Sequence, residues 1–241
     1  MSVTNEVNKI LGIRDSYKAP DKIYEILTSD IEKRNVVFMK FLELFEYDTS
    51  YDWFHQYFQD EHADRKNKKQ DFTPNSVSDL LVKMTQGGVT IYEPTAGTGG
   101  VLIRKWHDDR MRTNPFEYRP SDYLFHAEEL SDRAIPFLLF NLIIRGMNAI
   151  VIQADTLTRE SYGAFFIQND KDDDLQFSSL NVLEYSDRFE KMLNINFVEE
   201  KYKTLTQSEF IPTRIANPPR FKRERQEDKD FFEFLKSLYV T

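Results

Sequence analysis

The feature that most constrains this chain is an alternation of short apolar runs with longer helical patterns between residues 89 and 155. Short apolar runs bounded by turn residues are typical of buried strands, and three- and four-residue spacing is typical of helices. The pattern predicts strands at 89–94, 123–129 and 149–155 and helices at 97–110 and 131–146. Alternating strands and helices form a parallel sheet with crossover helices on both faces. The sequence therefore predicts an α/β fold.

Further elements are expected on both sides of this core. They are helices within 20–47 and at 52–62, 75–86 and 228–240, and a fourth strand over 212–219. Pro20 suits the first turn of a helix, where its missing N–H has no intrahelical partner. An aromatic stripe in 52–62 is more typical of core packing than of base stacking, and its members are Trp53, Phe54, Tyr57 and Phe58.

Two stretches suggest how the chain is divided. The polar residues 63–70 are interpreted as a hinge, and the long mixed stretch 160–210 is interpreted as an insertion with short elements of its own. We therefore expect a helical N-terminal region over residues 1–68 and an α/β domain over residues 69–241.

Composition excludes several classes of protein. The 241 residues include no cysteine, which excludes disulfides and thiol catalysis and is compatible with a reducing cytosol. No apolar run is long enough to cross a bilayer and no signal peptide is recognisable, so we expect a soluble, cytoplasmic protein. The four histidines are scattered and are interpreted as surface residues, so no metal site is expected.

Charge is unevenly distributed along the chain. A net charge of -8 argues against a protein that binds nucleic acid alone. Basic residues nevertheless gather in 65–69 and 214–225, whereas 168–174 is acidic. Local patches of this kind matter more for docking than the total charge does.

A glycine-rich turn follows the first predicted strand. Gly97, Gly99 and Gly100 stand where an open α/β sheet binds nucleotide-like ligands, although a surface turn uses the same residues. The turn has no following lysine, so it is not a triphosphate-binding P-loop. Glu93 precedes the glycines, and a carboxylate there repels a pyrophosphate but attracts an ammonium. The ligand is therefore expected to carry an amino-acid group.

Two more acids stand at strand ends. Glu129 ends the second predicted strand, where a carboxylate can accept hydrogen bonds from ribose hydroxyls. Asp155 ends the third, where it can reach an adenine amino group. Each acid alone is interpreted as a loop charge, but three acids at successive strand ends are more specific, because these ends face one crevice.

Five motifs in order resemble those of amino-group DNA methyltransferases. They are DFTP (71–74), EPTAGTGG (93–100), AEE (127–129), ADTL (154–157) and NPPR (217–220). The order is most similar to that of the modification subunit of type I restriction–modification systems. That resemblance implies a Rossmann-like S-adenosylmethionine-dependent methyltransferase that acts on adenine in double-stranded DNA, together with specificity and restriction subunits.

The resemblance also implies roles for individual residues. The cofactor would be held by Phe72, Thr73, Glu93, Thr95, Ala96, Gly97, Thr98, Gly99, Glu129, Asp155 and Asn217. The catalytic loop would be Asn217, Pro218, Pro219 and Arg220, and flanking phosphates would contact Arg214, Lys222, Arg223 and Arg225.

The Asn-Pro-Pro elbow suits the chemistry of an adenine amino group. That nitrogen is a poor nucleophile because its lone pair is delocalised into the ring. The side-chain carbonyl of Asn217 and the backbone carbonyl of Pro218 can accept its two N–H groups, and the prolines fix the backbone that presents these acceptors. Held in this way, and flipped out of the duplex, the nitrogen can attack a methyl group.

Departures from the family pattern leave alternatives open. Arg220 stands where the family has an aromatic residue that stacks on the flipped base, with Phe221 one residue later. The strands that follow NPPR in the family do not follow it here, so we expect either that a partner chain supplies them or that the chain is a truncated product. A non-catalytic cofactor-binding or assembly protein, and a protein glutamine methyltransferase, are the alternative functions.

Overall fold

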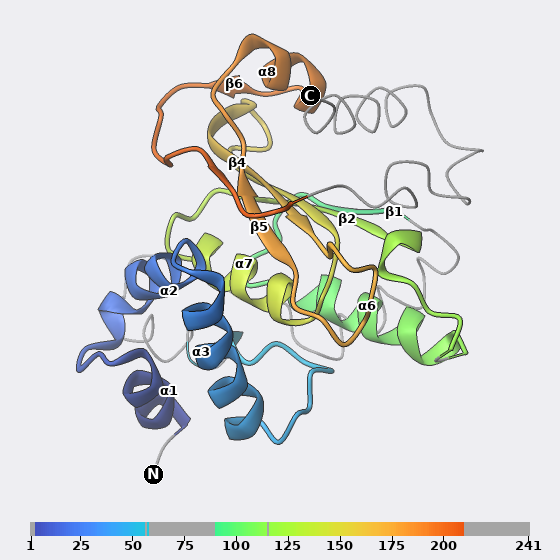
Figure 1. Ribbon diagram of the computed structural model, residues 1–241. Helices are drawn as coiled ribbons and strands as arrows, with labels where there is room; N and C mark the ends of the chain where they lie inside the picture. Colours follow the sequence, from blue (N-terminus) through green and yellow to red (C-terminus); the bar gives the residue numbers. More distant parts are fainter. Residues whose placement is uncertain (1–2, 56, 58–89, 115, 210–241) are drawn as a thin grey trace.

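The computed structural model describes residues 3–55, 57, 90–114 and 116–209 (Figure 1). The described helices are α1 (Val3–Leu11), α2 (Ala19–Leu27), α3 (Ile31–Leu44), α6 (Gly100–Arg112), α7 (Ile135–Ile144) and α8 (Asp187–Leu193). The strands are β1 (Thr90–Glu93), β2 (Leu124–Glu129), β3 (Ala149–Ala154), β4 (Glu160–Gln168), β5 (Ser179–Val182), β6 (Asn196–Phe197) and β7 (Leu205–Thr206). Short 3₁₀ turns occur at Ser16–Lys18 and Pro120–Asp122. None of these helices is long and apolar enough to cross a membrane.

The first half of the sheet agrees with the sequence prediction. Strands β1, β2 and β3 are adjacent and parallel, and α6 and α7 connect them. The helices α2 and α3 occupy the predicted 20–47 segment, and Pro20 lies in the first turn of α2. The predicted hinge at 63–70, the helices at 75–86 and 228–240, and the strand at 212–219 lie outside the described residues.

The second half of the sheet corrects the expectation of a purely parallel sheet. β4 returns antiparallel to β3, and β5 and β7 add further antiparallel pairs. The strand order is β1-β2-β3-β4-β5-β7, and β6 pairs in parallel with β4. The connection of 155–159 between β3 and β4 is too short for a crossover helix, so only a hairpin can form. Residues 160–206 therefore extend the same sheet with their short elements.

The crossover helices cover one face of the sheet, not both as expected. Strand order advances in one direction from β1 to β3, and right-handed crossovers then place α6 and α7 on the same side. Their apolar side chains join one core with Phe125, Val151 and Phe165 of the sheet. The opposite face packs against α8 through Phe189 and Leu193.

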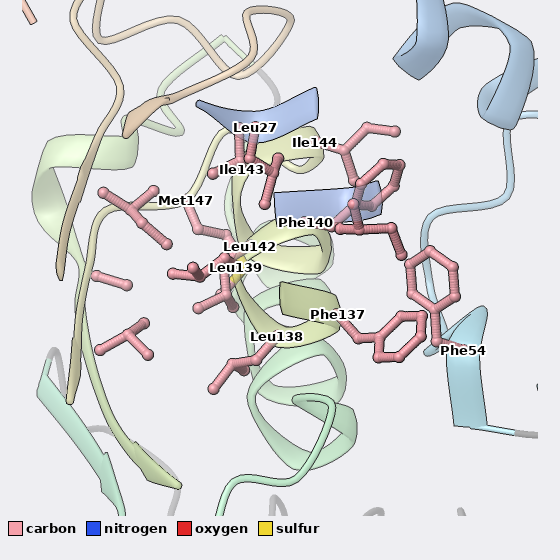
Figure 2. Close-up of a cluster of buried hydrophobic side chains, with 14 of the residues drawn as sticks. Leu27, Phe54, Phe137, Leu138, Leu139, Phe140, Leu142, Ile143, Ile144 and Met147 are labelled. Carbon is pink, nitrogen blue, oxygen red and sulfur yellow. The ribbon is translucent and has the colours of Figure 1, made fainter. Parts of the chain in front are cut away.

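Helix α7 is the centre of the larger core. All of its residues are buried, as its almost entirely apolar sequence requires, because the sheet covers one side and the N-terminal helices cover the other (Figures 1 and 2). Figure 2 shows Phe54 against Phe137 and Phe140, with ring centroids 4.8 Å and 5.2 Å apart.

The aromatic stripe belongs to this core, as its spacing predicts. Trp53, Phe54 and Tyr57 are at most 3% exposed, and Phe58 lies outside the described residues. The N-terminal helices and the sheet therefore share one hydrophobic core through α7.

Candidate functional site

The carboxyl ends of three neighbouring strands meet at one edge of the sheet. Glu93 ends β1, Glu129 ends β2 and Asp155 follows β3. Glu93 is in register with Ala127, two residues before Glu129. Because side chains alternate along a strand, Glu93 and Glu129 share the sheet face that α6 and α7 cover.

The glycine turn fills the space between the ends of β1 and β2. Gly97 and Gly99 have φ angles of 56° and 96°, a left-handed conformation that side chains disfavour. Gly99 N–H donates to the carbonyl of Ala96 at 2.8 Å, and Ala96 N–H donates to the carbonyl of Glu128 at 2.9 Å. These bonds attach the turn to the end of β2 and begin α6 at Gly100.

Glu129 is bonded to the backbone of the glycine turn and to the backbone that follows β2. Its Oε2 accepts from Gly97 N–H at 2.8 Å, and its Oε1 accepts from Ser131 N–H at 2.7 Å. A carboxylate has about four acceptor positions, so each oxygen retains capacity for a ligand donor. Glu129 can therefore hold the glycine turn and still accept from hydroxyl groups.

Glu93 carries a buried oxygen that has no hydrogen-bond partner among the described residues. Burial, and next the charge of Glu129, raise the pKa of Glu93 to about 8. A carboxylate with a buried oxygen next to a second carboxylate is stabilised by a cation. This arrangement suits a cationic ligand such as an ammonium.

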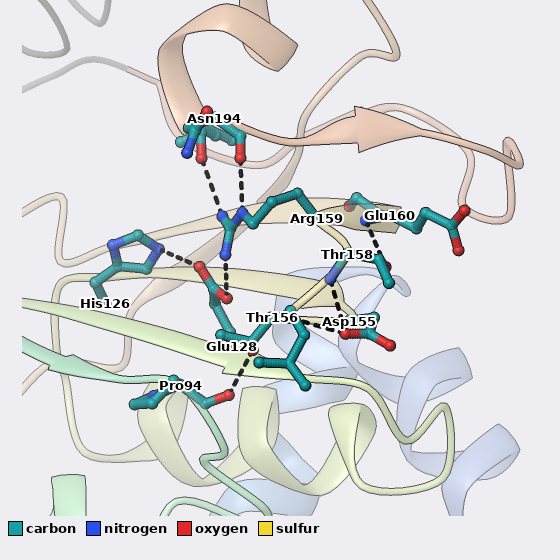
Figure 3. A network of polar contacts seen from close by, with 12 residues as sticks. Pro94, His126, Glu128, Asp155, Thr156, Thr158, Arg159, Glu160 and Asn194 are labelled. Atoms are coloured by element: carbon teal, nitrogen blue, oxygen red, sulfur yellow. Dashed lines mark hydrogen bonds and ion pairs between the residues drawn. The ribbon is translucent and has the colours of Figure 1, made fainter.

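The side chain of Asp155 accepts hydrogen bonds from the backbone of its own loop (Figure 3). Its Oδ1 accepts from the N–H groups of Leu157 and Thr158 at 2.8 Å and 3.1 Å. The hydroxyl of Thr156 donates to the carbonyl of Pro94 at 2.8 Å and so joins the loops that follow β3 and β1. The loop thus has a defined position beside the glycine turn.

The neighbour of Glu129 has a different role. Glu128 points to the opposite face of the sheet, where its Oε2 accepts from Arg159 Nη1 at 2.7 Å (Figure 3). Arg159 also donates to the carbonyl of Asn194 after α8 at 2.8 Å. His126 Nε2 lies 3.8 Å from Glu128 Oε1, and burial lowers the pKa of His126. This network joins the end of β2 to α8.

Some predicted site residues are not among those at the strand ends. The side chain of Thr98 is buried, and its hydroxyl donates to Asp52. This side chain therefore points into the protein interior. Thr95 is an exposed residue of the turn itself. Ten further predicted residues lie outside the described part of the chain, and they are Phe72, Thr73, Arg214, Asn217, Pro218, Pro219, Arg220, Lys222, Arg223 and Arg225. The basic segments 65–69 and 214–225 lie outside it as well.

Sequence reasoning missed a buried polar cluster beneath the turn, made by Asp52, Thr98, Asn141 and Arg145. Asn141 and Arg145 interrupt the apolar sequence of α7 and its end, and these polar residues were the signal in the sequence that could have indicated the cluster.

Across residues 3–55, 57, 90–114 and 116–209, no group of histidine, aspartate and glutamate side chains is arranged to hold a metal ion.

Comparison with known proteins gives a match to a family model and a similarity to a solved structure. The sequence model of the N-6 DNA Methylase family matches residues 47–212. A protein assigned as the modification subunit of a type I restriction enzyme from Vibrio vulnificus YJ016 is similar over 57% of this chain and 27% of its own, with 16% identity and a TM-score of 0.38. This chain therefore spans about a quarter of that protein's length. No curated protein matches the chain.

Proposed function

The chain belongs to the N-6 DNA methylase family, and we propose that it transfers a methyl group from S-adenosylmethionine to the exocyclic amino group of adenine in DNA. The observation that carries the proposal is the pair of carboxylates at the glycine turn, where one buried oxygen of Glu93 has no hydrogen-bond partner within the described part of the chain. That site favours a ligand with an amino-acid group and a positive charge.

The residues at the strand ends fit this cofactor. Glu93 would accept from its ammonium, because a cation removes the cost of a buried carboxylate next to Glu129. Glu129 would accept from ribose hydroxyls with its remaining lone pairs, and the loop after Asp155 would lie against the adenine ring. S-adenosylmethionine supplies an activated methyl group on its sulfonium when it is bound.

The chain's contribution to methyl transfer would be orientation. We propose that Asn217 and Pro218 accept the two N–H groups of the target nitrogen, so that its lone pair points at the methyl carbon. Holding two reacting groups in line supplies a large part of a rate gain of this kind. Arg214, Lys222, Arg223 and Arg225 would bind phosphates next to the flipped base.

By its motif order, the chain is proposed to act as a type I modification subunit, with DNA specificity supplied by another subunit. The second candidate function is a non-catalytic assembly protein with the same cofactor site. Arg220 favours it, because a guanidinium stacks on a base less well than the aromatic ring that the family has at this position.

Cofactor binding is expected to release protons through Glu93. Its pKa of about 8 keeps the free site mostly protonated at pH 7, and a bound ammonium favours the ionised form. Binding at pH 7 should therefore release about one proton, and affinity should rise as pH increases toward 8. Calorimetry in buffers of different ionisation enthalpy measures this number.

A matched variant separates Glu93 from other titrating groups. Glu93→Gln keeps the size of the side chain but has no proton to release, so the dependence of the binding enthalpy on buffer should disappear. Equal proton release by the two proteins would show that Glu93 does not receive the cation. The absence of cofactor binding at millimolar concentration would refute the proposed function itself.

The amide of Asn217 is expected to be needed for methyl transfer. Asn217→Ala removes one acceptor from the target nitrogen and should slow tritium transfer from labelled cofactor to unmethylated bulk DNA by about 100-fold. Asn114→Ala, which changes an exposed asparagine near the far end of α6, should keep the wild-type rate. Equal background transfer by all three proteins would leave the assembly role.

A further inference from the structure

We propose that Asp52, from the N-terminal region, is a positioning residue for the cofactor site, because it holds the glycine turn in place from inside the protein. The inference rests on the proposed function for the identity of the ligand. It assigns to residues 49–54 a task that is distinct from core packing. It also makes the N-terminal region a component of the site.

Both carboxylate oxygens of Asp52 accept hydrogen bonds in the protein interior. Its Oδ2 accepts from the hydroxyl of Thr98 at 2.5 Å. Its Oδ1 accepts from Phe54 N–H at 2.9 Å and from Asn141 Nδ2 at 2.8 Å. Asn141 Nδ2 also donates to the carbonyl of Thr98 at 2.8 Å, so the cluster binds both the side chain and the backbone of Thr98.

Thr98 is the residue at which this cluster can control the turn. It stands between Gly97 and Gly99, the two residues with left-handed backbone. Gly97 N–H is bonded to Glu129 at the end of β2, and on the inner side Thr98 is bonded to Asp52. The turn is thus held from two sides, and glycines that flank Thr98 have no side chains to restrict them if the inner bond is lost.

Arg145 fixes the position of Asp52. Its guanidinium donates to the carbonyls of Thr49 and Tyr51 at 2.8 Å and 2.6 Å and to the carbonyl and side-chain oxygens of Asn141 at 2.8 Å and 2.9 Å. Its charge also lies over the ring of Trp53, 4.9 Å from the centroid. Residues 49–54 are therefore attached to the end of α7, and Asp52 is presented to the turn from a fixed backbone.

Asp52 differs in position from Asp170, a second acid that is hydrogen-bonded to neighbouring side chains. Asp170 makes comparable bonds to Gln168 and Ser179, but it lies at the opposite edge of the sheet, after the end of β4. Removing either acid should destabilise the protein, because each leaves polar partners without a bond. Only Asp52 should also change the glycine turn.

The test compares Asp52→Ala with Asp170→Ala in the full chain. Hydrogen exchange of the segment 94–103, which needs no ligand, should accelerate in Asp52→Ala alone. The dissociation constant of S-adenosylmethionine, measured below the unfolding temperature of both variants, should rise about 10-fold or more in Asp52→Ala. In Asp170→Ala it should remain within about threefold of the wild-type value.

Two further variants keep the proposal testable. Asp52→Asn retains the oxygen that accepts from Phe54 and Asn141, and its amide can donate to the hydroxyl of Thr98, so it should restore affinity to within about threefold of the wild type. Thr98→Val replaces the hydroxyl by a methyl group of similar size. If Asp52→Ala does not fold, Thr98→Val should show the same faster hydrogen exchange and weaker cofactor binding.

The outcomes separate this inference from the proposed function. Wild-type exchange in the segment 94–103 of Asp52→Ala, or of Thr98→Val where that variant replaces it, would overturn the role of Asp52. Unchanged cofactor affinity in the same variant would overturn it as well. If the wild-type protein fails to bind S-adenosylmethionine, the proposed function is refuted, and hydrogen exchange alone decides whether Asp52 holds the turn.

Discussion

Replacing Arg145 by methionine is expected to lower the free energy of unfolding by about 3–5 kcal/mol, the range seen when one partner of a buried charge network is removed. Arg145 is 3% exposed, and burial lowers its pKa only to about 10, so it is charged at neutral pH. Methionine fills similar space but donates nothing to the carbonyls of Thr49 and Tyr51 or to Asn141. It also removes the positive charge that faces Asp52.

The matched control for this loss is Arg110→Met. Arg110 also pairs with an acid, Asp174, at 2.8 Å, but its side chain is 31% exposed and water can replace the partner. This change should cost less than about 1 kcal/mol in urea unfolding. Similar losses in the two variants would show that the buried position of Arg145 adds no stability beyond that of a surface pair.

Replacing Gly99 by alanine is expected to cost about 3 kcal/mol of stability and to remove cofactor binding. Two effects add at this residue. Its φ of 96° disfavours any side chain by about 1–2 kcal/mol. The added Cβ would also lie 2.9 Å from Leu138 Cδ1, and overpacking of this kind costs about 1–3 kcal/mol. Urea unfolding measures the loss, and calorimetry measures binding.

Gly12→Ala is the control that isolates the contact with α7. Gly12 follows α1 with a φ of 70°, and a Cβ there would meet nothing within 4 Å. It should therefore cost about 1 kcal/mol, the conformational part alone, and leave cofactor binding unchanged. Equal losses at Gly12 and Gly99 would contradict the close packing of the glycine turn on Leu138.

Local patterns were sufficient for the parallel half of the fold. The strands that end at Glu93 and Glu129, the turn at Gly97 and the helices that follow are all confirmed, because short apolar runs, glycines and helical spacing are properties of neighbouring residues. The shared face of Glu93 and Glu129 follows from the same patterns, since alternation along a strand fixes the direction of each side chain.

Long-range pairing explains what the sequence did not reveal. β4 reads as a mixed segment, since its partner is decided by the short loop at 155–159 and not by its own composition. Asp52 and Thr98 are 46 residues apart and meet only because α7 lies between the sheet and the N-terminal helices. Arg145 looks like a helix-end charge in the sequence, and its burial depends on the loop at 49–51.

The central place of α7 has a consequence for synthesis on the ribosome. Helices α1 to α3 emerge before α7, because the apolar side chains of α7 that cover them are translated much later in the chain. At about 5–20 residues per second, that delay is roughly 5–20 seconds. We therefore expect Phe38 and Phe41 to lack one of their packing partners during this interval, because both rings contact Phe140 of α7 in the folded protein.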